Sequence, residues 1–465
     1  MASVFQFAHT LAFSPEEAET TLRQIPTLPG VFALYGPRDT DQPYLTRAAD
    51  LRRRMLRLLA PPDSQSKRLN LREKVARIEY TVTGSEFESL LVLYQSLAAH
   101  FGYPEARRRM RLHTPFFLRL TMEHAHPRVY STNRLSKRNL AQMYGPFPSR
   151  AAAERYCDAV LDLFKLRRCY EDLEVSPTHP GCAYGEMKKC MAPCNQSCTA
   201  DEYRAEAEAV QGFFDSHGQS LLDTIARDRE RASSEMEFEQ AASLHAHFQR
   251  VKAAAALADE LVEPLPRLRA VITQPAAKED SNQTDRAALF LLEGGCLLGP
   301  ASLSTLGVRA VREQTEVGSS LFAQPLMLQA VPLEGESTTA DSPELRAATV
   351  IATLEAEATP ATDIAMLSDH LSLLRRWYYR PEKQRIGEIF FPNADSKWPI
   401  RRVLRGAARM ALGEPKAMAE TQRDAAAAAK VKILHEGRPD VERVVPVVAK
   451  RGRRGKAVLP ADVQP

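Results

Sequence analysis

The chain has 465 residues, 44% of them hydrophobic, and a formal net charge of +4. This composition excludes a wholly disordered protein, and the length suits about three domains. The sequence has no run of about 18 apolar residues, as a transmembrane helix would need. No Lys or Arg precedes Arg23, which excludes a typical secretory signal. We therefore expect a soluble cytoplasmic protein without a membrane partner, whose thiols stay reduced.

Residues 20–103 predict a small α/β domain. Short β-rich runs with Gly and Pro between them indicate strands, and apolar residues on one side of a run indicate helices. Ser85 is the expected N-cap of the last helix, with Glu88 three residues later as in a capping box. The expected elements are strands at 28–36, 42–48 and 77–84 and helices at 49–60 and 85–101.

The rest of the chain predicts a multidomain α/β protein. The expected parts are an α/β region at 104–200 that ends in a cysteine cluster, a helical region at 201–262, a small α+β region at 263–430 and a disordered basic tail at 431–465. Within 263–430, a hairpin around Gly294-Gly295 spans 287–303, and mostly helical stretches follow around 344–380 and 403–430. Polar, turn-rich stretches at 274–286 and 334–344 indicate loops.

A basic patch lies within the first domain. Between Arg47 and Arg77 there are ten Lys or Arg residues and three Asp or Glu residues. Such a patch attracts phosphate and would bind nucleic acid in a salt-sensitive, mainly sequence-independent way. A solvated helix face is the equally weighted alternative. The candidate DNA-binding residues are Arg52, Arg53, Arg57, Lys67 and Arg68.

Three motifs of this domain resemble the GIY-YIG nuclease domain of the bacterial UvrC family of excinuclease proteins: PGVF (29–32), YLTRA (44–48) and DLRRR (50–54). In that family two tyrosines, an arginine and a metal-binding glutamate form the catalytic site. The resemblance implies that Tyr44, Arg54 and Arg47 are remnants of it.

Three catalytic positions of the family carry other residues here. Phe32, Leu58 and Leu93 stand in place of the catalytic Tyr, Tyr and Glu. Phenylalanine cannot exchange a proton and leucine cannot bind a metal, whereas metal-assisted cleavage needs both functions. We expect the domain to bind the DNA backbone, to hold no divalent metal firmly and to cleave poorly or not at all. Glu88 or Gln95 would be the alternative ligand.

Five of the seven cysteines lie between residues 169 and 198. In a reduced compartment such density suits zinc or an iron–sulfur cluster, and spacing alone does not choose between them or exclude unliganded thiols. PGCAYGEMKKCMAPC (180–194) resembles the C-x7-C-x3-C core of the UvrC family. The resemblance implies a [4Fe–4S] cluster, with zinc as the alternative, on Cys169, Cys182, Cys190 and Cys194. Cys198 is then an extra thiol, and Cys157 and Cys296 are expected to be buried.

The helical region contains an apolar seam over 233–256, which predicts packing on another helix. EFEQAASLHAHF (237–248) also resembles the UVR motif, through which the UvrC family docks on UvrB, the helicase-like component of the excinuclease. The matching residues, and hence the expected partner-binding residues, are Phe238, Glu239, Ala241, Ala242 and Leu244. His245 and Ala246 replace the Arg-Asp pair of the family, which would weaken charge-assisted docking.

The C-terminal third resembles only the start of the family's RNase H-like nuclease domain, at 287–303 and 375–392. The acidic segment of that nuclease and the helix-hairpin-helix module are not found, so a truncated protein without the second active site is expected. Asp363 and Asp369 fall in a helical context. Trp377, Tyr378 and Tyr379 would either stack on bases or, as we favour, pack against a small sheet.

Two functions follow from these observations. The first is the nuclease component of an excinuclease, an endodeoxyribonuclease that acts on damaged DNA with UvrA and UvrB in bacterial nucleotide excision repair. The second is a catalytically inactive adaptor that binds DNA and engages the repair complex without cutting. The replacements at Phe32, Leu58 and Leu93 favour the second for the N-terminal site.

Overall fold

A computed structural model provides the structure of the protein. It describes residues 5–38, 40–61, 69–170, 173–278, 285–308, 342–358, 363–413, 430–435 and 438–446. The chain divides into two units, Met1–Gly413 and Glu414–Pro465. No helix in the described ranges has both the length and the apolar character that are needed to span a bilayer.

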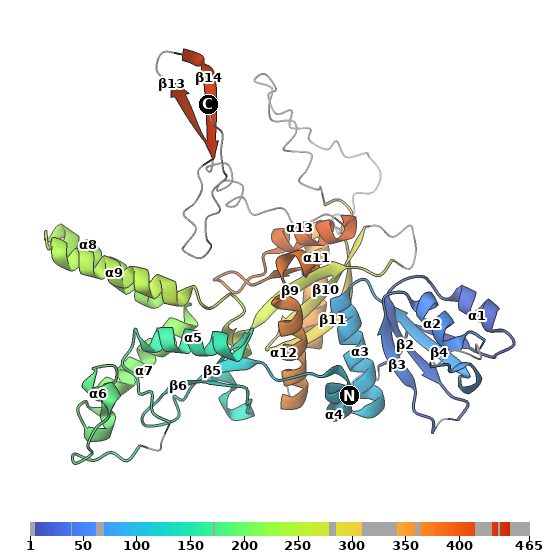
Figure 1. Ribbon diagram of the computed structural model, residues 1–465, viewed down its shortest axis with the longest axis horizontal. Helices are drawn as coiled ribbons and strands as arrows, with labels where there is room; N and C mark the ends of the chain where they lie inside the picture. Colours follow the sequence, from blue (N-terminus) through green and yellow to red (C-terminus); the bar gives the residue numbers. More distant parts are fainter. Residues whose placement is uncertain are drawn as a thin grey trace, which may run out of the picture. The chain divides into compact units, whose positions relative to one another are not determined.

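A four-stranded antiparallel sheet forms the N-terminal domain (Figure 1). Its strand order is β1-β4-β2-β3. The strands are β1 (His9–Ala12), β2 (Gly30–Tyr35), β3 (Tyr44–Ala48) and β4 (Arg77–Val82), and α1 (Ala18–Gln24) and α2 (Leu51–Leu59) accompany them. All five elements expected in 20–103 are present. The sheet nevertheless begins at β1, before the expected domain boundary at residue 20, because β1 pairs with β4.

Local capping explains where the two main helices of this domain begin. The Asp50 carboxylate accepts from Arg53 N at 2.9 Å at the start of α2, and Ser85 Oγ accepts from Glu88 N at 3.1 Å at the start of α3 (Glu86–Phe101). The capping box is modified, because the Glu88 carboxylate accepts from Gly84 N at 2.8 Å. A short helix, α4 (Tyr103–Met110), follows α3.

A second antiparallel sheet, of order β6-β5-β7-β8, forms the middle of the chain. Its elements are β5 (Phe116–Leu120), β6 (Val129–Thr132), β7 (Met143–Phe147), β8 (Glu263–Pro264) and the helices α5 (Arg150–Leu161) and α7 (Ala200–Asp215). One hydrophobic cluster joins this sheet to α5 and α7. In the cysteine segment, residues 169–198, the described residues form the short helix α6 (Ala183–Glu186) and a 3-10 turn at Pro193–Asn195, and Met191 and Cys198 pack against this core.

Two long helices, α8 (Gln219–Ser234) and α9 (Phe238–Ala255), form an antiparallel hairpin (Figure 1). Only the root of α9 is buried, at Val251 and Ala254. Residues 201–262, which were expected to be helical and to include a helical hairpin, contain α7, α8 and α9.

A third sheet, of order β11-β10-β9-β12, organises the C-terminal part of the first unit. Its strands are β9 (Arg269–Pro275), β10 (Arg286–Glu293), β11 (Cys296–Ser304) and β12 (Glu388–Phe390), with α11 (Pro343–Glu357), α12 (Ile364–Tyr378) and α13 (Ile400–Leu412) around it. The predicted hairpin at 287–303 is confirmed by β10 and β11. The other short 3-10 segments of the chain are Arg72–Lys74, Lys137–Gln142, Leu265–Arg267 and Glu382–Gln384.

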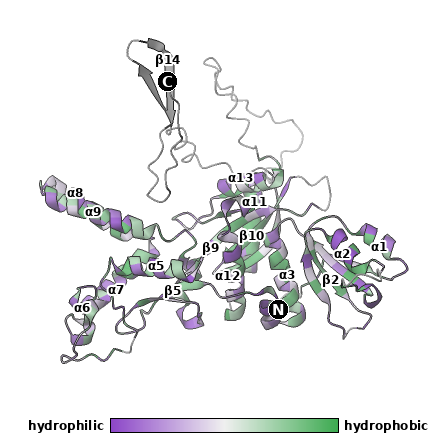
Figure 2. Cartoon of the chain, in the orientation of Figure 1, coloured by the Kyte–Doolittle hydropathy of each residue, from purple (hydrophilic) through white to green (hydrophobic). Residues whose placement is uncertain are grey.

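Strand alternation gives this third sheet two apolar faces. Leu289 and Leu291 belong to a cluster with α11 and α13, whereas Phe290 and Leu292 belong to a cluster with α12 and α3. Figure 2 shows the apolar colouring of β10 between these helices. Because α3 shares the second cluster, the N-terminal domain and the C-terminal sheet are packed together through α3 and α12.

A buried polar network reinforces this contact. Arg107 Nε donates to Asp369 Oδ1 at 2.7 Å, and Tyr94 OH donates to Asp369 Oδ2 at 3.1 Å. The aromatic cluster that ends α12 is also used for packing, since Trp377 is 3% exposed and Tyr379 OH donates to Pro146 O at 2.8 Å. The packing alternative is therefore confirmed for Trp377 and Tyr379.

The second unit contains two antiparallel strands, β13 (Lys430–His435) and β14 (Arg438–Pro446). The sequence predicted disorder from residue 431 onward. The alternation of Val, Ile and Leu with charged residues in KVKILH provides the β-propensity for these strands. The rest of the predicted tail, and most of 414–430, lie outside the described residues.

Candidate functional sites

The structure brings together two of the three predicted catalytic remnants. Tyr44 begins β3 and Arg54 lies on α2, and Arg54 Nη2 donates to the Tyr44 hydroxyl at 3.1 Å. The Asp50 cap fixes the start of α2, and β3 pairs with β2 in the register Leu34 to Tyr44. A phenol and a guanidinium are thus held side by side and half-buried at the edge of the N-terminal domain.

The third remnant, Arg47, has a different partner. Arg47 Nη2 lies 3.1 Å from a Glu86 carboxylate oxygen, and Arg380 Nη1 lies 2.6 Å from the other oxygen. The hydrogen bond from Arg380, followed by the charges of Arg380 and Arg47, lowers the pKa of Glu86. Glu86 therefore neutralises part of the positive charge of Arg47 and Arg380, which would otherwise be available to bind a phosphate. Glu86 was not among the predicted site residues, because its partner Arg380 follows α12 and lies 294 residues later in the chain.

The three replaced catalytic positions are all buried. Phe32 is fully buried and its ring centroid lies 6.3 Å from that of Tyr44. Leu58 is 3% and Leu93 is 9% exposed. Glu88, the alternative ligand, is also buried and caps the start of α3. Within the described ranges, no three His, Cys, Asp or Glu side chains are arranged to hold a single metal ion.

A hollow of about 510 Å³ opens beside Tyr44. Arg38 and Lys74 line it from the loop after β2 and from the turn before β4, together with Asp41 and Glu73. The sequence analysis did not connect these residues to the site. The Gly36-Pro37 pair after β2 could have indicated from the sequence that a loop begins there. That loop forms one wall of the hollow beside Tyr44.

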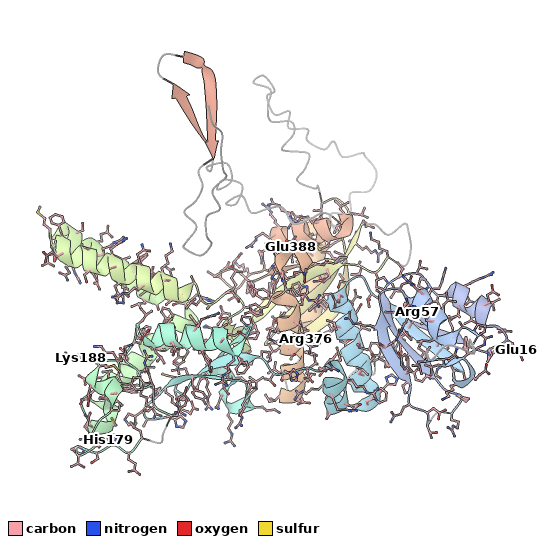
Figure 3. The ribbon with its side chains drawn as sticks, in the orientation of Figure 1. Glu16, Arg57, His179, Lys188, Arg376 and Glu388 are labelled. Carbon is pink, nitrogen blue, oxygen red and sulfur yellow. The ribbon has the colours of Figure 1, made fainter. Side chains whose placement is uncertain are left out.

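The basic patch divides into exposed and structural arginines. Arg53 and Arg57 are exposed on α2, and the described part of the chain offers neither an ion-pair partner. Arg52, in contrast, donates from Nη2 to Arg23 O at 2.9 Å and from Nε to Ile25 O, so it connects α2 to the end of α1. Lys67 and Arg68 lie outside the described residues. Figure 3 labels Arg57 among the side chains of this domain.

Three of the four predicted ligand cysteines, Cys169, Cys182 and Cys194, lie close enough to the fourth, Cys190, for their charges to affect its pKa. Burial, and then the neighbouring Cys182, Cys169 and Cys194, raises the pKa of Cys190 to about 11, although Ala192 N donates to its Sγ at 3.3 Å. Cys190 and Cys194 are buried, whereas Cys169 and Cys182 are half-buried. The four thiols are thus gathered in space, in a segment with almost no regular secondary structure.

Positive groups surround these thiols. Arg167 is 8% exposed, and its Nη1 donates to Cys169 Sγ at 3.8 Å. Cys198, the extra thiol, is close enough to Cys194 for the charge of Cys194 to contribute to its raised pKa, after burial and Glu202. The two remaining cysteines, Cys157 and Cys296, are 7% and 6% exposed, which confirms their predicted burial.

The residues of the UVR-like motif lie at the far end of the α8–α9 hairpin. Phe238 is 71% exposed, Glu239 and Ala242 are exposed, and Ala241 and Leu244 are half-buried. In place of the family's Arg-Asp pair, His245 Nδ1 lies 3.4 Å from Arg229 Nη1 on the facing helix. The hairpin therefore presents an apolar residue to solvent at its tip.

These features define a mixed α/β multidomain protein with a basic α/β domain, a cysteine-rich segment and a projecting helical hairpin. Comparison with known proteins identifies the middle of it. Residues 116–213 match the model of the UvrC/Cho excinuclease middle domain. In this chain the matched range runs from β5 into α7 and includes the whole cysteine segment.

Curated relatives extend the match. The UvrABC system protein C of Idiomarina loihiensis is 28% identical over 226 residues, which are 49% of this chain and 36% of that protein. The protein of the same name from Desulforudis audaxviator is 28% identical over 329 residues, 69% of this chain and 52% of that protein. The UvrABC system protein C of Aliivibrio salmonicida is 26% identical over 314 residues, which are 67% of this chain and 49% of that protein.

These matches support membership of the UvrC family for the part of the chain that they cover. The match spans about a third to a half of the length of these curated relatives. No solved structure matches the chain.

Proposed function

We propose that this protein binds DNA as a UvrC-like component of nucleotide excision repair and that its N-terminal domain does not cut. The observation that carries the proposal is the hydrogen bond between Arg54 and Tyr44, at 3.1 Å. The other positions that are catalytic in the family carry buried apolar residues in this domain: Phe32, Leu58 and Leu93. Arg54 would hold a phosphate, with the exposed Arg53 and Arg57 beside it.

The chemistry of cleavage argues for the adaptor over the excinuclease. Hydrolysis of a phosphodiester needs a group that accepts the proton of the attacking water and, in this family, a carboxylate for a divalent metal. The Phe32 ring accepts no proton, and a buried leucine at position 93 offers the metal no oxygen. Tyr44 remains, but its hydroxyl accepts a hydrogen bond from Arg54. The site retains phosphate binding and lacks the groups for bond cleavage.

Incision of a lesion-containing duplex, with UvrA, UvrB and magnesium present, tests the proposal. The wild-type protein is compared with the double variant Tyr44→Phe/Arg54→Ala. We expect DNA binding without incision by the wild type and weaker binding by the variant. Incision that is lost in the variant would establish the excinuclease instead.

We propose further that Cys169, Cys182, Cys190 and Cys194 hold a [4Fe–4S] cluster. The donor set fits, because four thiols converge in one loop and thiolates are the ligands of such clusters. Arg167 would stabilise the thiolate form of Cys169.

Backbone strain in the same loop supports a bound group. Lys188, Ala192 and Gln196 are left-handed, with φ of 57°, 53° and 58°. Non-glycine residues in this region cost about 1–3 kcal/mol each when strained, and persist where their surroundings fix them. Anaerobic purification with iron and acid-labile sulfide analysis tests the cluster. About four irons per chain, lost in Cys190→Ser, are expected, whereas stoichiometric zinc would contradict it.

The α8–α9 hairpin is the proposed docking site for UvrB. Its support is the exposed Phe238 at the tip, since an exposed aromatic residue on a rigid hairpin suits a protein interface. Phe238→Ala should weaken binding to UvrB, and the equally conservative Leu345→Ala on α11, where Leu345 is 50% exposed, should not. Equal binding by both variants would exclude this surface.

A further inference from the structure

An exposed tyrosine next to the cysteines is supported from behind by a stack of side chains. Tyr170 follows Cys169 and is 72% exposed. The Arg128 guanidinium lies 5.2 Å from the Tyr170 ring centroid and 5.0 Å from that of Tyr130 on β6. Tyr130, Arg128 and Tyr170 therefore form a stack, of which Tyr170 is the solvent-exposed member.

Hydrogen bonds hold this stack in place. Arg128 Nη1 donates to Cys169 O at 3.0 Å, which ties the guanidinium to the backbone beside Tyr170. Arg119 Nη1 donates to the Tyr130 hydroxyl at 3.1 Å, which fixes the inner ring. Among the described residues no carboxylate forms an ion pair with Arg128. The stack is thus positively charged and preorganised, with one aromatic face directed outward.

A second tyrosine of the cysteine segment has a similar neighbour. Tyr184 is 39% exposed, and the Arg168 guanidinium lies 5.9 Å from its ring centroid. Arg168 Nη2 also pairs with Asp162 Oδ1 at 2.7 Å. Both exposed tyrosines of the cysteine segment thus have an arginine next to the ring.

The surroundings add further apolar and positive groups. Met187 is 56% exposed and Lys188 is exposed, and Figure 3 shows Lys188 at the border of the cysteine segment. Isolated exposed apolar residues are common on proteins, but here four large ones, Tyr170, Val175, Tyr184 and Met187, lie within 18 residues. Arg167 and Arg168 precede this span, and Lys188 and Lys189 follow it. Aromatic faces between positive charges are the composition of surfaces that bind single-stranded nucleic acids.

We propose that Tyr170, supported by Arg128 and Tyr130, is a stacking site for an unpaired base of DNA, with Lys188 and Tyr184 contacting the same strand. The inference rests on the proposed DNA binding and specifies which form of DNA this lobe prefers. Bases in an intact duplex are already stacked on their neighbours, so only an unpaired base offers its face to Tyr170. The phosphates of that strand complement the charges of Arg128 and Lys188.

Equilibrium binding of fluorescent DNA to the full chain tests the site. The probes are an intact duplex and the same duplex with a central unpaired stretch that contains 2-aminopurine. We expect Tyr170→Ala to weaken binding to the unpaired probe by about 5- to 10-fold and to leave duplex binding unchanged. Tyr170→Phe keeps the ring and should bind as the wild type does. Quenching of 2-aminopurine on binding should be lost with Tyr170→Ala only.

Two further variants make the test specific. Arg128→Lys keeps the charge but removes the planar stack, so it should weaken binding to the unpaired probe and not to the duplex. Tyr103→Ala is the matched control, because Tyr103 is 37% exposed on α4 and its ring neighbour is Tyr94. Circular dichroism of each variant verifies folding.

The outcomes separate this inference from the proposed function. Equal losses on both probes, or no loss for Tyr170→Ala, would overturn the stacking site while DNA binding stands. The second result is also the one expected if Tyr170 contacts a protein partner. Failure of the wild type to bind either probe would overturn the proposed function itself.

Discussion

The ion pair between Arg107 and Asp369 joins the N-terminal domain to the C-terminal sheet, and replacing Arg107 by Leu tests its contribution. Asp369 is 1% exposed and accepts from Arg107 and from Tyr94. Breaking a buried pair costs about 3–5 kcal/mol, because the remaining charge is left uncompensated. The Arg107 side chain is 37% exposed, so solvent screens part of the interaction, and we expect a loss of about 2–3 kcal/mol of unfolding free energy.

The pH dependence of this loss provides a sharper criterion. Burial raises the pKa of Asp369, and Arg107 opposes that rise. Without Arg107 the pKa rises further. A carboxyl whose pKa is higher in the folded than in the unfolded state contributes stability at low pH that is lost as pH rises through the folded pKa. Arg107→Leu should therefore be more destabilising at about pH 8 than at about pH 5.

Urea unfolding followed by the fluorescence of Trp377, in a Trp398→Phe background, measures the effect on α12 directly, because Trp377 is buried on that helix. The matched control is Arg108→Leu. Arg108 pairs with Glu105 on the same short helix at 2.7 Å, but its side chain is 76% exposed, so we expect little or no loss of unfolding free energy. Equal costs for the two variants, or a cost for Arg107→Leu that does not vary with pH, would refute the reasoning.

Three further predictions concern strain, titration and binding. Gly30→Ala should cost about 1–3 kcal/mol of unfolding free energy, because the added Cβ would clash with the Thr81 carbonyl oxygen on β4; an unchanged urea midpoint would contradict this. Burial lowers the pKa of His370 to about 4, so the free energy of unfolding should fall by up to about 3 kcal/mol as pH drops from 6.5 to 4. In urea titrations at several pH values, His370→Asn should make the free energy of unfolding less dependent on pH. Replacing Arg53 and Arg57 by Ala should reduce the salt-dependence slope of duplex binding by about 2, whereas Arg52→Ala should lower the melting temperature and leave the slope unchanged.

Features that depend on neighbouring residues were predictable from the sequence. Asp50 and Ser85 are N-caps, as expected of small polar residues that directly precede a run with apolar residues at helical spacing. The strand pair at 287–303 forms around Gly294-Gly295, both of which have positive φ, as the turn requires. The burial of Cys157 and Cys296 followed from the general tendency of free cysteines to be buried. Each of these signals lies within a few residues of the feature that it specifies.

Features that depend on distant residues were not predictable. Glu86 binds Arg47 and Arg380, and neither pairing leaves a local trace in the sequence. Arg128 and Tyr170 are brought together only because the cysteine segment returns to β6, where the Cys169 carbonyl oxygen accepts from Arg128. Charge content alone therefore did not separate the exposed Arg53 and Arg57 from Arg52 and Arg47, which have partners within the protein.

The position that carries a metal-binding glutamate in the family has a different role in this chain, and Leu93→Glu tests whether the two roles are compatible. Leu93 lies on α3 in the cluster that also contains Leu373 and Trp377 of α12. A carboxylate there would lose about 2 kcal/mol of apolar burial and would have to be desolvated or protonated. We expect Leu93→Glu to lose more than about 2 kcal/mol of unfolding free energy and to gain no magnesium-dependent nicking, because the other catalytic positions carry Phe32 and Leu58. The volume-matched Leu93→Met should stay within about 1.5 kcal/mol of the wild type. A stable Leu93→Glu protein that nicks plasmid DNA would show that α3 still faces a working site and that the apolar contact with α12 is dispensable.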